Sequence, residues 1–320
     1  MRCDVRAVLG HARALDGKTE GRQFDARNRL RRFLHLSEGY LFILPALLVL
    51  VVLILYPVVD AFWVSLHRTS YATLREFNPL FNYVSFLRDP TVLASLRISL
   101  VFTAAVIGGH FLLALLFATV LNTNPRGSGF FRTVALLPWV LSGVASGIIW
   151  RWIYDASFGP ISEILRLLGV ANYQIAWLGD MQLALPAVIV ASIWKGFPFV
   201  MLMLLAGMQA IPTELYEAAK VDGATGLQNW RYITLPMLRN VIAICLILDT
   251  IWWFREFASI YTMTGGGPAR ATDVMVVHVY KDAFEFFEFG RAAAGSMVTL
   301  AISLCIMALY RRLLKADMEL

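Results

Sequence analysis

The chain has 320 residues, of which 58% are apolar and only 16% are Asp, Glu, Lys or Arg. Its mean hydropathy of +0.65 is too high for an ordinary water-soluble domain, which excludes most soluble enzymes and binding modules. The formal net charge of +6 lies on the flanks of apolar segments, and no basic stripe interleaved with aromatic residues occurs outside them. Composition therefore predicts an all-α polytopic membrane protein that lies in the lipid bilayer and has no nucleic-acid partner.

Six segments are apolar enough to cross a bilayer, since a span needs roughly 20 apolar residues. They cover about residues 40–64, 95–121, 133–153, 183–207, 238–263 and 292–310. The first segment has no small-residue cleavage site after it, which favours a retained span over a removed signal peptide. We therefore expect six transmembrane helices.

Basic residues indicate the orientation of these spans. Placing the amino terminus in the cytosol puts thirteen of the Lys and Arg residues in the flanks and loops on the inner side and six on the outer side. Both termini are then cytosolic. Residues 1–38 are expected to form a mobile basic tail, and 39–320 the membrane domain, with a cytosolic loop at 209–236. The outer loops are expected at 67–93, 154–181 and 264–290.

The loop at 209–236 is a polar island between two apolar segments. It contains Glu214-Leu-Tyr-Glu-Ala-Ala-Lys-Val-Asp-Gly-Ala224, followed by Trp230-Arg-Tyr-Ile-Thr-Leu-Pro236. Small residues such as Ala218 and Ala219 let a partner surface approach a short helix closely. Gly223 permits a turn with positive φ, and Pro236 is suited to the first turn of a helix. The segment is therefore interpreted as a docking element.

Several motifs carry a resemblance to a known family. They are Trp194-Lys-Gly-Phe-Pro198, Gly207-Met-Gln-Ala-Ile-Pro212, Glu217 to Gly223, Leu235-Pro236 and Thr264-Gly-Gly-Gly-Pro268. From about residue 40 to the C-terminus the chain resembles the permease subunits of carbohydrate-uptake ABC importers, and the Gly-Gly-Pro element is similar to that of the maltose-type "F" subunit. The resemblance implies a type I ABC importer permease fold and a multi-pass place in the bacterial inner membrane.

The resemblance also implies partners and a mechanism. The partners are a second permease subunit forming a heterodimer, two ATPase subunits and an extracytoplasmic sugar-binding protein. No cofactor is expected on this chain, because ATP and Mg would be bound by the partner ATPase, so the subunit is not itself an enzyme. Closure of the ATPases would move the spans in an alternating-access cycle that imports a sugar or sugar derivative. Cys3, Cys245 and Cys305 have no metal-type spacing, and no metal site is predicted.

Two sets of site residues follow from the resemblance. The set expected to couple the chain to the ATPase lies in the 214–231 segment and comprises Leu215, Tyr216, Glu217, Ala218, Ala219, Asp222 and Gly223. The set expected to line the substrate path comprises Trp139, Gly143, Ser192, Gly196, Phe199, Trp252, Trp253 and Glu256. Sugars bind to aromatic faces and hydrogen-bonding groups, so these residue types fit that role.

Charged and polar residues inside the spans need partners or a water-filled cavity. Arg255 and Glu256 are adjacent in sequence, so they do not share a helix face and are expected to have separate partners. A pair between Lys195 and Asp249 across two helices is one interpretation. His110 is expected to be a hydrogen-bonded packing residue rather than a proton relay.

Three alternative functions remain open at the sequence level. The chain could be an ABC permease for a phosphorylated polyol or a polyamine. A polytopic membrane enzyme would need an acid/base or nucleophile constellation near the interface, and the sequence offers none. A channel or secondary transporter working alone would leave the cytosolic docking loop unexplained.

Overall fold

The computed structural model describes residues 42–318 apart from 71–72 and 173, and it divides into two compact units, Met1–Asp60 and Ala61–Leu320. The predicted basic tail, 1–38, lies outside the described residues. Residues 42–50 are α-helical, the π-helix η1 covers Val51–Leu55, and α2 covers Tyr56–Ser65. The helical stretch Phe42–Ser65 has the length and composition of a membrane span, as the sequence predicted for this segment.

The second unit opens with elements that the sequence analysis did not resolve. An antiparallel hairpin pairs β1 (His67–Ser70) with β2 (Thr73–Phe77), and the short helix α3 (Phe81–Arg88) follows. Asn82 is buried and donates from its side-chain amide to the carbonyl oxygens of Ser65 and His67, at 2.8 and 2.7 Å. The segment between the first two spans therefore contains a hairpin and a short helix, which the sequence analysis gave only as a loop.

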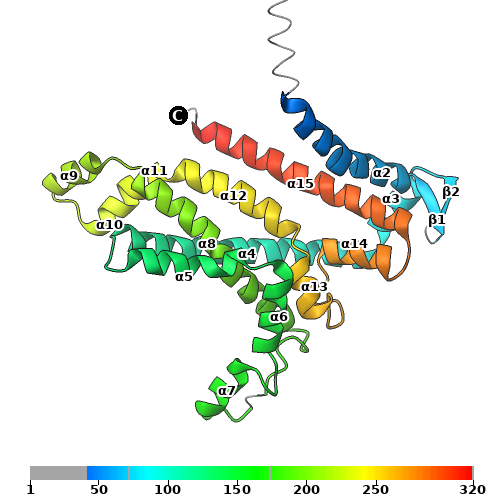
Figure 1. Cartoon of the computed structure of the whole chain (residues 1–320), viewed down its shortest axis with the longest axis horizontal. Helices are drawn as coiled ribbons and strands as arrows, with labels where there is room; N and C mark the ends of the chain where they lie inside the picture. Colours follow the sequence, from blue (N-terminus) through cyan, green and yellow to red (C-terminus); the bar gives the residue numbers. More distant parts are fainter. Residues whose placement is uncertain (1–41, 71–72, 173, 319–320) are drawn as a thin grey trace, which may run out of the picture. The chain divides into compact units, whose positions relative to one another are not determined.

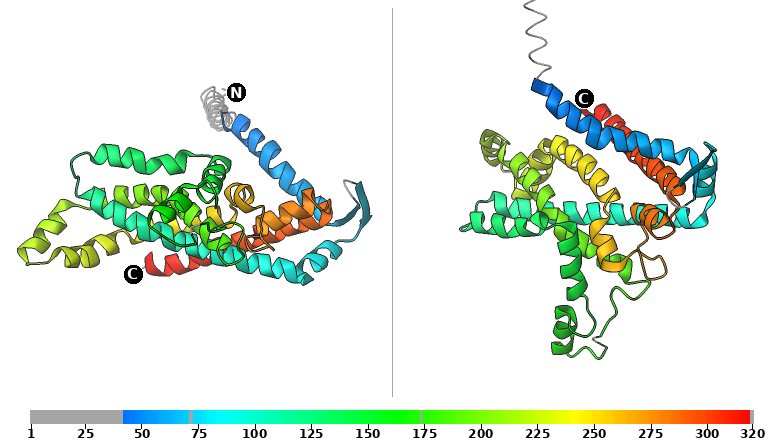
Figure 2. Two further views of the ribbon diagram at one scale, coloured as in Figure 1. Left: turned by 90° about the horizontal axis from the view of Figure 1, so that it is seen from below. Right: turned by 45° about the vertical axis from the view of Figure 1, so that its right-hand side comes forward.

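Two unbroken spans form the centre of the second unit. Helices α4 (Pro90–Asn122) and α8 (Ala184–Gln209) lie side by side in Figures 1 and 2 and contribute more of the buried apolar residues than any other described helix. Helix α4 begins where Asp89 accepts a hydrogen bond from the Thr91 amide, with Pro90 at the first turn. The apolar side chains of both helices pack against each other and form the core of the second unit.

The predicted span at 133–153 is broken. Helix α5 (Ser128–Val140) and helix α6 (Gly143–Ile153) meet at an angle of 98°. Leu141 and Ser142 have extended backbone, and the Ser142 side chain then caps α6 by accepting from the amide of Ala145 at 3.1 Å. A helix that ends and is capped again within two residues changes direction, so this span is not the single straight helix that its apolar run suggested.

The predicted span at 238–263 is also shorter and bent. A segment made of α10 (Gly226–Asn229), the π-helix η2 (Trp230–Thr234) and α11 (Leu235–Met237) meets α12 (Arg239–Phe254) at 61°. Pro236 lies in the first turn of α11, as predicted. Helix α12 then ends, and residues 255–257 are not helical before α13 (Ala258–Thr264) begins.

Four further helices complete the described chain. They are α7 (Pro160–Leu167), α9 (Thr213–Val221), α14 (Met275–Phe284) and α15 (Phe289–Met318). Among the described residues, four helices are long and apolar enough to span a membrane, or six spans if each bent pair counts as one. Figures 1 and 2 place α9 and α10 at one end of the second unit and the β1–β2 hairpin at the opposite end.

Candidate functional site

The predicted docking element forms a projecting loop at one end of the second unit (Figure 1). Helix α9 has no buried residue, and Leu215, Glu217 and Ala218 are all exposed. Tyr216 is half-buried because its hydroxyl lies 2.9 Å from the hydroxyl of Thr234, which ties α9 to η2. The contact between Tyr216 and Thr234 therefore ties helix α9 to the spans, and the face of α9 that carries Leu215 and Ala218 is exposed.

The turn after α9 requires glycine. Gly223 has a φ of +79°, and a Cβ built on it would meet no atom within 4 Å. Its amide donates to the carbonyl of Lys220, and the next amide, of Ala224, donates back to Ala219. The predicted positive φ is confirmed, and its purpose is to end α9 in a tight left-handed turn after the exposed cap residue Asp222.

Large apolar side chains project from this loop into the surroundings. Leu215 is 42% exposed, Val221 88%, Leu227 76% and Tyr232 70%. Exposed apolar side chains are typical of surfaces that bind a partner, so the loop is a candidate interaction site. The predicted coupling residues are all in this loop, and the sequence analysis did not name Val221, Leu227 and Tyr232, which are exposed apolar residues of the same loop.

Half of the predicted substrate-path residues meet on an open surface. Trp139 of α5 stacks on Phe199 of α8, with ring centroids 5.9 Å apart and an interplanar angle of 21°. Phe199 in turn lies 6.2 Å from the ring of Trp252 on α12. We call these three rings the aromatic surface. It borders an open pocket of about 470 Å³ lined by Phe199, Leu248, Ile251, Trp252, Arg255 and Glu256.

The other half of the set lies behind this surface. Ser192 is buried and its hydroxyl donates to the carbonyl of Val188 at 2.8 Å. Trp253 is 5% exposed, and Gly196 leaves room for its ring. Gly143 lies at the start of α6, where a Cβ would come within 3.4 Å of Glu256 Oε1. These four residues support the packing of the helices that carry the aromatic surface, and their part in solute contact stays a prediction.

A buried polar pair joins α4 to α12. The Nδ1 atom of His110 lies 2.8 Å from Oδ2 of Asp249, and both side chains are nearly inaccessible. The Nε2 atom of His110 lies 3.2 Å from the carbonyl oxygen of Ser192, so the ring bridges α4, α8 and α12. The expectation of a hydrogen-bonded packing histidine is confirmed, whereas the interpretation that Asp249 pairs with Lys195 is wrong, because His110 occupies that partner position.

Glu256 has a structural contact as well as a place in the pocket. Its Oε1 accepts from the Ser259 amide at 2.9 Å and from the Ser259 hydroxyl at 2.7 Å, which caps α13. The Arg255 side chain makes no ion pair or hydrogen bond with any residue in the part of the chain that the structure describes, and it also lines a smaller pocket with Ser296 and Thr299. The prediction of separate partners is therefore confirmed for Glu256, which binds Ser259, and is wrong for Arg255, whose side chain has no partner among the described residues and lines the same pocket.

The glycine-rich turn after α13 is a compact element. Gly265 and Gly266 have φ values of +58° and +83°, so two of the three glycines adopt backbone conformations that other residues rarely reach. The hydroxyls of Thr264 and Thr272 lie 2.6 Å apart across the turn. A Cβ on Gly266 would come within 2.6 Å of Nζ of Lys281, so the turn also packs directly on charged side chains.

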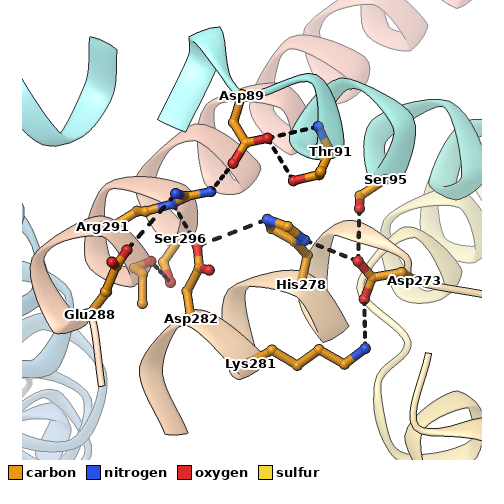
Figure 3. Close-up of polar contacts among 12 residues, drawn as sticks. Asp89, Thr91, Ser95, Asp273, His278, Lys281, Asp282, Glu288, Arg291 and Ser296 are labelled. Carbon is orange, nitrogen blue, oxygen red and sulfur yellow. Dashed lines mark hydrogen bonds and ion pairs between the residues drawn. The ribbon is translucent and has the colours of Figure 1, made fainter. Parts of the chain in front are cut away.

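Those charged side chains belong to what we call the polar network, shown in Figure 3, which lies between the start of α4, the loop before α14, α14 itself and the start of α15. Arg291 donates from Nε to Asp282 at 3.1 Å and from Nη2 to Asp89 at 2.5 Å. Its Nη1 lies 3.9 Å from the carboxylate of Glu288. One guanidinium thus holds together residues that are about 200 positions apart in the chain.

The second half of the network centres on Asp273, which is fully buried. It accepts hydrogen bonds from Ser95 and from Lys281, each at 3.2 Å, and lies 3.0 Å from Nδ1 of His278. The other ring nitrogen of His278 lies 3.9 Å from Asp282, which links the two halves. Burial acts to raise the pKa of Asp273, but the contacts with His278 and Lys281 outweigh it and hold this pKa below its ordinary value.

The pKa values of the two carboxylates bound by Arg291 are shifted in opposite directions. Burial acts to raise the pKa of Asp89, yet hydrogen bonds from Thr91 and Arg291 lower it to about 2. Burial raises the pKa of Asp282 above its ordinary value despite the nearby Arg291. The sequence analysis missed this network, since its members sit in segments that resemble solvated outer loops. Among the described residues, no group of three or more His, Cys, Asp or Glu side chains is arranged to hold a metal ion.

Residues 110–316 match the family described as binding-protein-dependent transport system inner membrane component. The matched stretch is more than half of the chain and contains the docking loop, the aromatic surface, both bent spans and most of the polar network. The chain belongs to this family. The family description also supports a multi-pass location in an inner membrane, as predicted.

Relatives of the permease cover nearly the whole membrane domain. The trehalose/maltose transport system permease protein MalF of Thermococcus litoralis is 38% identical over 263 residues, which are 82% of this chain and 87% of that protein. A probable ABC transporter permease protein of Brucella suis is 36% identical over 275 residues, 86% of this chain and 95% of that protein. The sn-glycerol-3-phosphate transport system permease protein UgpA of Agrobacterium fabrum is 32% identical over 277 residues, covering 85% and 93%.

The fold of the permease also matches a solved structure. A chain of a bacterial ABC transporter involved in the import of the acidic polysaccharide alginate superposes with a TM-score of 0.76 at 20% identity. The match covers 86% of this chain and 93% of that chain. The predicted ABC importer permease fold is therefore confirmed, and the family favours a transport subunit over the alternatives of a membrane enzyme or a lone channel.

Proposed function

We propose that the permease is the membrane-spanning subunit of an ATP-driven importer that moves a sugar or sugar derivative across the bacterial inner membrane. Relatives named for trehalose and maltose, for sn-glycerol-3-phosphate and for sulfoquinovosyl glycerol support a polyhydroxylated solute. The aromatic surface supports the same class, because stacked aromatic rings offer flat apolar faces to a pyranose ring.

The observation that carries the proposal is the exposed apolar surface of the docking loop. Leu215, Val221 and Leu227 project from a loop that lies at one end of the second unit. A partner that covers these side chains gains the free energy of their burial. A short helix bound this way can pass a rigid-body movement of its partner to the spans. The partner that fits is an ATPase subunit, with ATP and Mg bound there rather than on this chain.

The remaining partners follow from the same proposal. A second permease would complete the solute route next to the aromatic surface, and a second ATPase would dock on it. An extracytoplasmic sugar-binding protein would deliver the solute, as supported by the solved alginate transporter in complex with its pentasaccharide-bound periplasmic protein. The broken spans at 141–142 and 255–257 are breaks of the kind that transporters place near solute sites, and they suit an alternating-access cycle.

The proposal is tested by purifying the tagged permease in detergent from its native host and identifying the attached proteins. The expected result is a complex that contains an ATPase and a second permease, and that hydrolyses ATP when reconstituted with its binding protein. A lone chain, or a homodimer without an ATPase, would overturn the importer assignment and return attention to a membrane enzyme.

A pair of variants locates the docking surface. Leu215→Asp places a charge on the open side of α9 and is expected to lower the amount of co-purified ATPase strongly. Leu80→Asp changes a leucine that is 69% exposed next to α3, near the hairpin at the opposite end, and should retain the ATPase. Equal retention by both variants would show that α9 is not the docking site.

A second candidate solute class is a phosphorylated polyol. The relative named for sn-glycerol-3-phosphate covers 85% of this chain, and the pocket beside the aromatic surface contains a cationic side chain, Arg255. Uptake of radiolabelled sn-glycerol-3-phosphate and of maltose by the same reconstituted complex separates the two classes. Uptake of the phosphate alone would make this candidate the function.

A further inference from the structure

The aromatic surface is flanked by positive charge that the chain itself does not neutralise. Arg255 comes three residues after Trp252, at the point where α12 ends, and its side chain lines both the pocket of about 470 Å³ and its smaller neighbour. Within the described ranges, 42–70, 73–172 and 174–318, no carboxylate lies within ion-pair distance of it. The guanidinium is therefore available to a group from outside this chain.

Lys195 is a second cation of the same kind. It precedes Phe199 by four residues on α8, so the two side chains lie on one face of that helix. Phe199 is the central ring of the aromatic surface, in contact with Trp139 and Trp252. Lys195 is only partly exposed, and its side chain has no ion-pair or hydrogen-bond partner among the described residues. Phe199 and Trp252 thus each have a cationic residue about one helical turn away along the chain, Lys195 for Phe199 and Arg255 for Trp252.

The nearby acidic groups are already engaged. Asp249 lies on α12 but is buried against His110, with 3% of its side chain accessible. Glu256 lines the pocket, yet its Oε1 accepts two hydrogen bonds from Ser259. The carboxylates of Asp249 and Glu256 are thus directed at His110 and at Ser259, and neither forms an ion pair with Arg255 or Lys195.

An unpaired arginine or lysine in a membrane-spanning segment is costly unless it faces water or an opposite charge. Arg255 lines an open pocket with aromatic walls, and Lys195 lies on the same face of α8 as Phe199, which lines that pocket. Helix α12 ends beside this pocket, and interrupted helices are also found at the solute sites of other transporters. A ring with an attached anionic group complements this arrangement better than a neutral sugar or a cationic polyamine.

We propose that the solute class of this permease is an anionic sugar derivative, whose ring lies on the aromatic surface and whose carboxylate, phosphate or sulfonate group is bound by Arg255 and Lys195. This inference rests on the proposed function and narrows it. The two cations are then specificity-determining residues: the rings accept many pyranoses, whereas the cations select among them by charge.

The test uses the complete purified complex in lipid nanodiscs and three monosaccharides of the same ring, D-glucuronate, D-glucose and D-glucosamine. Saturation-transfer NMR titrations at neutral pH report the apparent affinity of each. We expect D-glucuronate to bind about tenfold more tightly than D-glucose, since a hydrogen bond to a charged group is worth roughly one such step. Raising the salt concentration should reduce this preference, because the pocket is open to solvent.

Variants assign the preference to the two cations. Arg255→Gln and Lys195→Gln should each remove most of the preference for D-glucuronate while D-glucose binding stays unchanged. Arg255→Glu should reverse it in favour of the cationic D-glucosamine. Arg239→Gln is the matched control: it removes an exposed arginine at the other end of the same helix, α12, and should behave as the wild type.

Two results would overturn the inference. One is the absence of any preference for D-glucuronate over D-glucose in the wild type, including binding of neither. The other is a loss of the second permease from the Arg255→Gln complex with no change in sugar preference, which would assign Arg255 to a subunit contact. Both leave the proposed function standing if the ATPase still co-purifies and ATP-dependent uptake continues, so the two failures are distinguishable.

Discussion

Gly196→Ala is predicted to be one of the most damaging single-methyl changes in the permease. Gly196 faces the buried pair of α4 and α12 from α8, and an added Cβ would overlap the ring of His110 and come within 2.5 Å of Cζ2 of Trp253. The His110 ring is held on both nitrogens, by Asp249 at 2.8 Å and by the Ser192 carbonyl at 3.2 Å. It therefore cannot turn away without losing a buried hydrogen bond.

The size of the effect follows from these contacts. Overpacking of a well-filled interior costs roughly 1–3 kcal/mol. Displacing His110 from the Asp249 carboxylate removes a hydrogen bond to a charged group, which adds roughly 1.5–3 kcal/mol. We expect Gly196→Ala to lower the free energy of unfolding by about 3–5 kcal/mol, or the Tm by about 6–10 °C at roughly 2 °C per kcal/mol for a chain of this size.

The assay is thermal unfolding of the purified complex in detergent, followed by intrinsic fluorescence. Gly108→Ala is the matched control, because it adds the same methyl group to α4, where a Cβ would meet nothing within 4 Å. It should leave the Tm unchanged or raise it slightly, since alanine favours a helix over glycine. If Gly196→Ala unfolds within 1–2 °C of Gly108→Ala, on the order of 1 kcal/mol or less, the claim that His110 is locked in place is refuted.

Three further predictions address other parts of the chain. Gly223→Val should abolish or greatly reduce ATP-dependent uptake without loss of membrane insertion, because a side chain at φ +79° disturbs the end of α9, whereas Gly226→Ala in the same loop should retain uptake. The pKa of Asp89 is about 2 in the folded state against an ordinary 3.8, so its carboxylate stabilises the fold above about pH 4 and this contribution is lost as the pH falls toward 2; acid titration of the Tm should be shallower for Asp89→Asn. Arg291→Met should cost about 3 kcal/mol by leaving Asp282 buried without its cation, and Arg291→Met with Asp282→Asn should recover part of that cost in a double-mutant cycle, whereas additive losses would mean that the pair is not coupled.

Much of the architecture could be predicted from the sequence because it depends on local pattern. Apolar runs of about 20 residues predict where the chain crosses a membrane, and all six predicted segments contain a described helix. The docking loop was also predictable, since Gly223 requires a backbone conformation that glycine alone adopts easily and Pro236 begins a helical turn. The hairpin β1–β2 was not predicted, although its β-branched and aromatic residues carry a weak strand signal.

The breaks in the spans were harder to predict. Ser142 caps α6 just after α5 ends, and Glu256 binds the first turn of α13 just after α12 ends, but serine and glutamate within an apolar run are equally compatible with a continuous helix. Hydropathy averaged over a window responds to the total apolar content rather than to the cap that changes the direction of the chain. The aromatic surface depends on these breaks, because they set the orientation of the helices that carry Trp139 and Trp252.

The sequence by itself determined the membrane class, the number of apolar segments, the docking loop and the chemical types of the candidate site residues, since each of these depends on neighbours along the chain. Only the tertiary structure decided the partners of the buried charges. His110 pairs with Asp249 across 139 residues and Arg291 with Asp89 across 202, and the two cations beside the aromatic surface were left unpaired. The physical reason is that the interaction between two charges depends on their distance in space and on their burial. Neither quantity can be read from the spacing of residues along the chain.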